Sequence, residues 1–162
     1  MEITFEEGMA ELCRPIIHEF GGNEKEFEKM VVMNMDQICQ HLNLPPIKAV
    51  ETQRRIKCDN FAIKPDIIVK HTDKTITVFE VKKRSEKYPL TGTSNQMNAI
   101  GQLLLYQTVL QAVTHATDIR MALIDNKIYY RTYCAFMNYK LPITLMEIQK
   151  DRLFVPYNGW NQ

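Results

Sequence analysis

The chain has 162 residues, of which 45% are hydrophobic and 24% charged, and its formal net charge is +1. These values predict one globular domain over residues 1–162 with its core at about 24–136, and they exclude disordered and fibrous proteins. No stretch approaches the ~18 apolar residues that a membrane helix needs. The N-terminus is acidic where a signal peptide would be basic and apolar, so we expect a cytoplasmic protein with no membrane partner.

Three helices are predicted from hydrophobic spacing, at about 5–19, 24–43 and 95–114. The second follows the Gly21-Gly22-Asn23 break, where Asn23 is a plausible N-cap, and Pro45-Pro46 ends it.

Strands are predicted between and after these helices. They lie at about 48–58, 62–71 and 75–83 and, after the long helix, at about 117–125 and 127–136, where Asp125-Asn126-Lys127 forms a tight turn. The segment from about 143 to 162 has no clear pattern. The order helix, three strands, helix, two strands predicts an α/β fold with a mixed central β-sheet flanked by helices.

Two acids and a lysine fall on neighbouring predicted strands. Glu80 and Lys82 point to the same face, because side chains alternate along a strand. A hairpin centred near Asp73 has Asp66 seven residues before its centre and Glu80 seven residues after it. This register places the two carboxylates opposite each other, with Cβ atoms roughly 5 Å apart.

Facing carboxylates on a half-buried sheet repel each other unless a cation offsets their charge. Mg²⁺ suits such a pair, since it takes one or two carboxylates together with water and substrate phosphate. Lys82 would then position water or neutralise charge that develops on the phosphate. The spacing therefore indicates metal-assisted hydrolysis of a phosphodiester.

The residues Pro65-Asp66, a spacer of thirteen, and Glu80-Val81-Lys82 resemble the signature of the PD-(D/E)XK nuclease superfamily. That superfamily includes restriction enzymes, junction resolvases and RecB-type nucleases. The resemblance implies a restriction-endonuclease-like fold and Mg²⁺- or Mn²⁺-dependent cleavage of DNA. It also implies that Asp66, Glu80 and the Val81 carbonyl bind the metal, and that Lys82 is catalytic.

Further positions fit the same resemblance. Members often carry a metal-assisting acid on the helix before the strands; Glu24 is the first candidate and Glu28 the second, although both also suit a solvated helix end. RecB-like members carry Gln and Tyr four residues apart on the next helix. Gln102 and Tyr106 match that spacing and share one helical face, with Gln102 a catalytic candidate and Tyr106 a phosphate contact.

Basic residues flank the proposed site and predict a nucleic-acid surface. They are Arg54, Arg55, Lys57, Lys83, Arg84 and Lys87. Two alternatives to a DNA nuclease stay open: a catalytically silent module that binds nucleic acid or supports assembly, and an RNA-directed nuclease. A second copy of the chain is a candidate partner, through about 1–20 and 137–162. The four scattered cysteines and four isolated histidines predict no iron–sulfur cluster and no catalytic histidine.

Overall fold

A seven-stranded mixed sheet runs through the middle of the molecule, in the order β1-β9-β8-β7-β6-β5-β2. The computed structural model describes residues 14–15, 22–83, 92–149 and 152–161. The strands are β1 (Arg14–Pro15), β2 (Ile47–Thr52), β5 (Ile67–His71), β6 (Ile76–Val81), β7 (Ile119–Asp125), β8 (Ile143–Gln149) and β9 (Arg152–Tyr157). Strands β2, β5 and β6 form an antiparallel meander, whereas β7 runs parallel to β6 and β8 parallel to β7.

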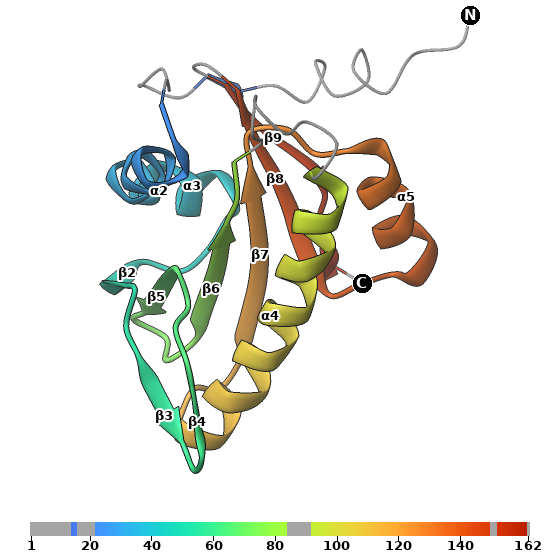
Figure 1. Cartoon of the computed structure of the whole chain (residues 1–162). Helices are drawn as coiled ribbons and strands as arrows, with labels where there is room; N and C mark the ends of the chain where they lie inside the picture. The colour runs from blue at the N-terminus through green and yellow to red at the C-terminus, as the bar shows by residue number, and fades with distance from the viewer. Residues whose placement is uncertain (1–13, 16–21, 84–91, 150–151, 162) are drawn as a thin grey trace, which may run out of the picture.

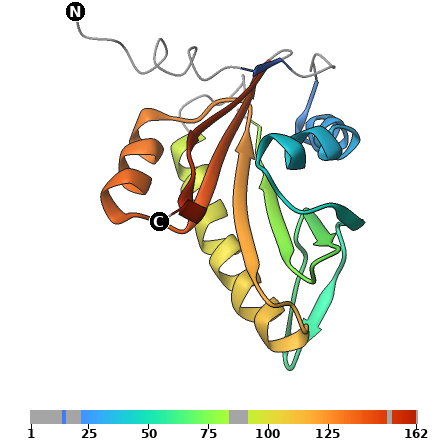
Figure 2. The same cartoon turned by 180° about the vertical axis from the view of Figure 1, so that it is seen from behind.

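Helices cover both faces of this sheet (Figure 1). The helices α2 (Glu24–Met33) and α3 (Met35–His41) lie on one face, and α4 (Gly92–Val113) and α5 (Tyr130–Tyr139) lie on the other, as the view from behind also shows (Figure 2). A short 3-10 turn, η2 (Gly159–Asn161), follows β9. The structure therefore confirms the predicted α/β fold, with its helix, antiparallel meander, helix and parallel strand in chain order. Among the described helices, none combines the length and apolar character needed to cross a bilayer.

Two hydrophobic clusters fill the layers between the helices and the sheet. Alternation along β6 sends Phe79 and Val81 toward α2 and α3, and Ile76 and Val78 toward α4. Every residue of β6 is buried, as expected for a central strand covered on both faces. This burial fixes the register of β6, because a slip of one residue would exchange its two faces.

The helix expected at about 24–43 is divided in two by Asn34. The buried Asn34 side chain donates to the Met30 carbonyl at 2.9 Å, so it takes up an acceptor of the first helix and ends it there. The expected helix at about 5–19 is wrong at Arg14–Pro15, which form β1 against β9. The rest of that expected helix lies outside the described residues.

The strands expected at about 48–58 and 62–71 are each divided. Their adjoining halves are β3 (Ile56–Cys58) and β4 (Phe61–Ile63), which pair with each other as a hairpin separate from the main sheet. We call residues 54–65 the arm. Figure 1 shows its hairpin extending from the sheet beside the far end of α4. Ile63 and, partly, Ile56 and Cys58 pack on the α4 side of the core, which anchors the arm.

The strand expected at about 127–136 is wrong, because residues 130–139 form α5. Thr132 and Phe136 lie four residues apart and are both buried, whereas Tyr130 and Met137 are exposed. A helix places Thr132 and Phe136 together on one buried face, whereas a strand would also put the exposed Tyr130 on that face. The segment 137–162, a candidate dimer surface, contributes β8 and β9 to the sheet, with Ile143–Ile148 buried; the dimer stays a prediction.

Candidate active site

The β5–β6 hairpin has the register expected from the sequence. Ile67 pairs with Phe79 and Ile68 with Val78, so the next pair outward is Asp66 with Glu80. Asp66 lies just before β5 and is half-buried. One oxygen of its carboxylate, Oδ2, accepts a hydrogen bond from the Val81 backbone nitrogen at 2.8 Å. The hairpin therefore brings Asp66, Glu80 and the Val81 peptide together.

Glu80 is a buried acid with incomplete hydrogen bonding. Its Oε1 lies 3.3 Å from Nζ of Lys82, whose side chain is 20% exposed. Its Oε2 is buried and has no hydrogen-bond donor among the residues that the structure describes. Burial, followed by the nearby Asp66 carboxylate, raises the pKa of Glu80 to about 8, and Lys82 only partly opposes this. The buried carboxylate therefore lacks positive charge on one side.

Helix α4 brings Gln102 and Tyr106 to the same part of the molecule. Tyr106 is buried on the α4 side of the sheet, and burial, followed by the charges of Glu80 and Asp66, raises its pKa. The Oε1 atom of Gln102 is buried with no hydrogen-bond partner in the described part of the chain. An unpaired buried amide oxygen is unfavourable, so it is available to a ligand. The catalytic role expected for Gln102 stays a prediction.

Both helix acids lie close to the hairpin, but they contact different groups. Glu24, the first candidate, accepts a hydrogen bond from the Lys83 backbone nitrogen at 3.2 Å. Glu28, the second, is joined to Asp66 through the Gln53 side chain, whose Nε2 lies 3.0 Å from both Glu28 carboxylate oxygens and 2.9 Å from Asp66 Oδ1. Burial, together with the Asp66 charge, raises the pKa of Glu28. Glu28 therefore has the more direct connection to Asp66.

These groups fit a divalent cation that retains water. Within the described ranges, no three side chains of the types His, Cys, Asp and Glu form a preformed metal cage. Mg²⁺ does not require one, since it usually keeps several waters and is bound through one or two carboxylates. The unpaired Oε2 of Glu80, next to Asp66, is the kind of oxygen that such an ion would take.

The basic residues predicted to bind nucleic acid are only partly brought together. Arg55 and Lys57 are exposed on the arm, whereas Arg54 is bound to Glu51 through its Nη1 at 2.7 and 2.8 Å. Lys83 lies beside the site, where its Nζ donates to the Gly22 carbonyl. Arg84 and Lys87 lie outside the described residues.

A pocket of about 880 Å³ lies between α2 and the start of β5, beside Asp66. Glu24, Glu28 and Gln53 line it, together with three lysines that sequence reasoning did not select, Lys25, Lys29 and Lys64. Lys25 and Lys29 are four residues apart and so share a helical face, which is a signal that was available in the sequence. Gln53 had no such signal, because its position depends on the fold of the arm.

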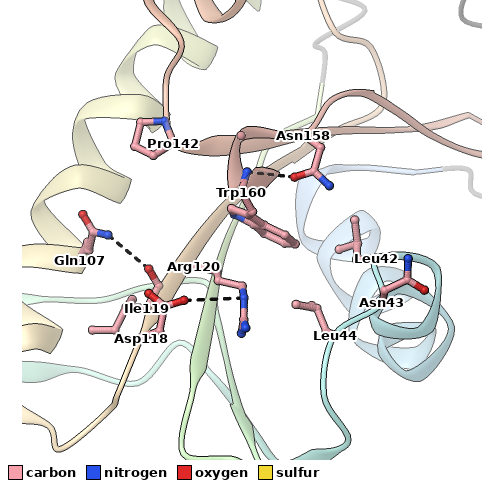
Figure 3. A pocket seen from close by; sticks show the side chains of 11 residues that line it. Leu42, Asn43, Leu44, Gln107, Asp118, Ile119, Arg120, Pro142, Asn158 and Trp160 are labelled. Carbon is pink, nitrogen blue, oxygen red and sulfur yellow. Dashed lines mark hydrogen bonds and ion pairs between the residues drawn. The ribbon is translucent and has the colours of Figure 1, made fainter. Parts of the chain in front are cut away.

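A second pocket, of about 590 Å³, lies at the other end of the parallel strands (Figure 3). Asp118 and Arg120 line it at the start of β7, and Trp160 closes one side. The indole Nε1 of Trp160 donates to the Met121 carbonyl at 2.9 Å, which fixes the ring against β7. None of the acids near Asp66 lines this pocket, so it is separate from the candidate active site.

Comparisons with known proteins give a distant structural likeness. No family model matches the chain, and no curated protein matches it. The structure is similar to that of an XisH family protein from Nostoc punctiforme, with 15% identity, a TM-score of 0.46, and coverage of 76% of this chain and 90% of the other. It is also similar to an fdxN element excision controlling factor protein from Anabaena variabilis, with 16% identity, a TM-score of 0.44, and coverage of 74% and 90%.

Proposed function

We propose that the protein is a Mg²⁺- or Mn²⁺-dependent nuclease that hydrolyses phosphodiester bonds in DNA. The observation that carries this proposal is the Glu80 carboxylate, which is 2% exposed, faces Asp66 and has one oxygen without a donor in the described part of the chain. Burying a second acid beside Asp66 is unfavourable without a compensating positive charge. Two adjacent acids suit a metal-dependent nuclease, because such an enzyme must hold a divalent cation against the phosphate of its substrate.

Asp66 and Glu80 would hold the cation, with the Val81 carbonyl as a further ligand. When bound, the cation supplies an activated water and stabilises charge on the phosphate. Lys82 directly follows β6 and shares the face of Glu80, and its ammonium lies 3.3 Å from the Glu80 carboxylate. From there its charge would stabilise the transition state, or it would orient the attacking water.

Positive side chains near the site supply the contacts with the substrate backbone. Lys25, Lys29 and Lys64 line the pocket beside Asp66, and the arm adds Arg55 and Lys57. Phosphate contacts of this type dominate affinity for nucleic acid. A chain with a net charge of +1 would bind DNA through this local group of basic residues rather than through its overall charge.

A cleavage assay with a matched lysine control tests the proposal. Purified protein with Mn²⁺ or Mg²⁺ should cleave plasmid or branched DNA, and Lys82→Ala should abolish cleavage while circular dichroism and Mn²⁺ binding persist. Lys48→Ala is the control, because Lys48 is an exposed residue on β2 outside the site. Chelation of the metal should stop the reaction.

The alternatives give different results in the same experiment. Mn²⁺ binding that depends on Asp66, without cleavage of any DNA or RNA, would identify a silent module with a nuclease fold. Cleavage of RNA alone would identify an RNA-directed enzyme. Loss of cleavage in Lys48→Ala as well as in Lys82→Ala would remove the specific role of Lys82.

A further inference from the structure

Gln53 occupies a strained position at the junction between the sheet and the arm. Its backbone nitrogen donates to the Asp66 carbonyl at 2.9 Å, which extends the β2–β5 ladder by one pair beyond Thr52 and Ile67. Its φ angle is +51°, in the left-handed region that non-glycine residues seldom adopt. Such conformations persist where surrounding contacts hold them, and they are concentrated at functional sites.

The side-chain amide of Gln53 lies between two acids. Its Nε2 is within 3.0 Å of three carboxylate oxygens, two from Glu28 and one from Asp66. The nitrogen must face these oxygens, because the amide oxygen would be repelled by them. Lys64 lines the same pocket, but Glu28 and Asp66 have no ion-pair partner among the described residues.

An amide nitrogen and a metal ion cannot share this position. The nitrogen is held at about 3 Å from its oxygens, whereas Mg²⁺ binds carboxylate oxygens at about 2.0–2.1 Å and would draw them inward. The amide also carries no net charge, so it leaves the repulsion between Glu28 and Asp66 largely in place. A cation that bridges these two acids must therefore displace the amide nitrogen.

We propose that Gln53 is a positioning residue whose amide keeps Glu28 from joining Asp66 and Glu80 around the cation, and so lowers the affinity of the site for divalent metal. This inference rests on the proposed metal-dependent function and concerns how that site is regulated. Gln53 stabilises the metal-free protein, and metal binding includes the loss of its hydrogen bonds. Removing the amide therefore makes the metal-free protein less stable and makes metal binding tighter.

The test compares wild type with Gln53→Met and Gln53→Glu. Methionine keeps an unbranched side chain, so the left-handed backbone is under the same constraint, but the hydrogen bonds are lost. Glutamate adds a third carboxylate. Mn²⁺ affinity is measured by calorimetry, and thermal unfolding is measured with and without Mn²⁺. Gln40→Met, an exposed substitution on α3, is the matched control.

We expect Gln53→Met to bind Mn²⁺ several-fold more tightly and to unfold at a lower temperature without metal. Gln53→Glu should show both effects more strongly, and Gln40→Met should match wild type. Unchanged or weaker Mn²⁺ binding in Gln53→Met would overturn the inference, and so would absence of Mn²⁺ binding in every variant. If Mn²⁺ binds as expected but no nucleic acid is cleaved, only the nuclease assignment fails.

Discussion

The Nζ atom of Lys82 lies 3.3 Å from Oε1 of Glu80, on the same face of β6. This pairing does not fully compensate the Glu80 charge, since burial and Asp66 still raise its pKa to about 8. The Glu80 carboxyl is therefore largely protonated near neutral pH when no metal is bound. Its ionisation and metal binding are linked, because a cation binds the deprotonated form.

This linkage predicts how the metal-free protein responds to pH. The pKa of Glu80 is about 8 in the folded state, whereas an ordinary glutamate has a pKa of 4.5, so between these pH values the folded state holds more protons than the unfolded state. Stability should therefore fall as the pH rises from about 5 to 8, with a slope approaching about 1.4 kcal/mol per pH unit. Urea unfolding at several pH values measures this. Glu80→Gln should flatten the curve, and a curve unchanged by that substitution would show that Glu80 has an ordinary pKa.

The two helix acids should differ in their effect on metal binding. Glu28→Gln should weaken Mn²⁺ binding by about tenfold, or about 1.4 kcal/mol, because only the Gln53 amide separates Glu28 from Asp66 and a cation that displaces this amide gains Glu28 as a ligand. Glu24→Gln should have a smaller effect, because Glu24 contacts the Lys83 backbone. Calorimetry of the two matched variants gives the comparison. The reverse order of effects would support Glu24 as the helix acid.

Removing the Tyr106 hydroxyl should affect cleavage more than folding. Tyr106 is 6% exposed on the α4 side of the sheet, and its hydroxyl makes no hydrogen bond to the described residues. Tyr106→Phe should therefore retain the melting temperature of wild type, while cleavage falls by about tenfold, the loss expected for one hydrogen bond to a phosphate. Steady-state cleavage and thermal unfolding are measured together. Full activity would show that the hydroxyl does not contact substrate.

The arm should contribute to DNA affinity through Arg55 and Lys57 rather than Arg54. Replacing either exposed residue by alanine should weaken binding at low salt and reduce the slope of log K against log salt by about 0.9. Arg54→Ala should have little effect, because Arg54 already donates two hydrogen bonds to Glu51. Fluorescence anisotropy at several salt concentrations provides the measurement. Equal slopes in all three variants would place the DNA elsewhere.

Local patterns in the sequence predicted the centre of the fold. The polar turn at residues 71–74 predicted the β5–β6 register. Pairing the apolar strands on its two sides symmetrically about the turn gives the register that the structure has. The apolar stripe of the second predicted helix continues past Asn34. The break between α2 and α3 depends on one side-chain hydrogen bond of Asn34, which the hydrophobic pattern does not reveal. Aromatic residues such as those near Tyr130 have a local preference for strands. The helix α5 forms there because it packs Thr132 and Phe136 against the sheet, which is a tertiary contact.

The candidate site was predictable to the extent that it depends on one hairpin. Asp66, Glu80 and Lys82 follow from strand alternation and a turn. Gln53 and the pocket lysines come together only because the arm leaves the sheet at Gln53 and α2 packs over that point. Contacts between segments so far apart in the chain depend on tertiary packing, which periodicity does not report.

The arm starts and ends at two ladder partners, since the Gln53 nitrogen bonds the Asp66 carbonyl directly. The hydrogen bond between Gln53 and Asp66 closes the base of the arm whatever the length of the arm. A longer arm would add little to the entropic cost of closing this loop. Residues 54–65 can therefore differ in length and sequence while the β5–β6 register that pairs Asp66 with Glu80 stays the same. Under the proposed function, contacts between the arm and DNA would then change independently of the acids Asp66 and Glu80.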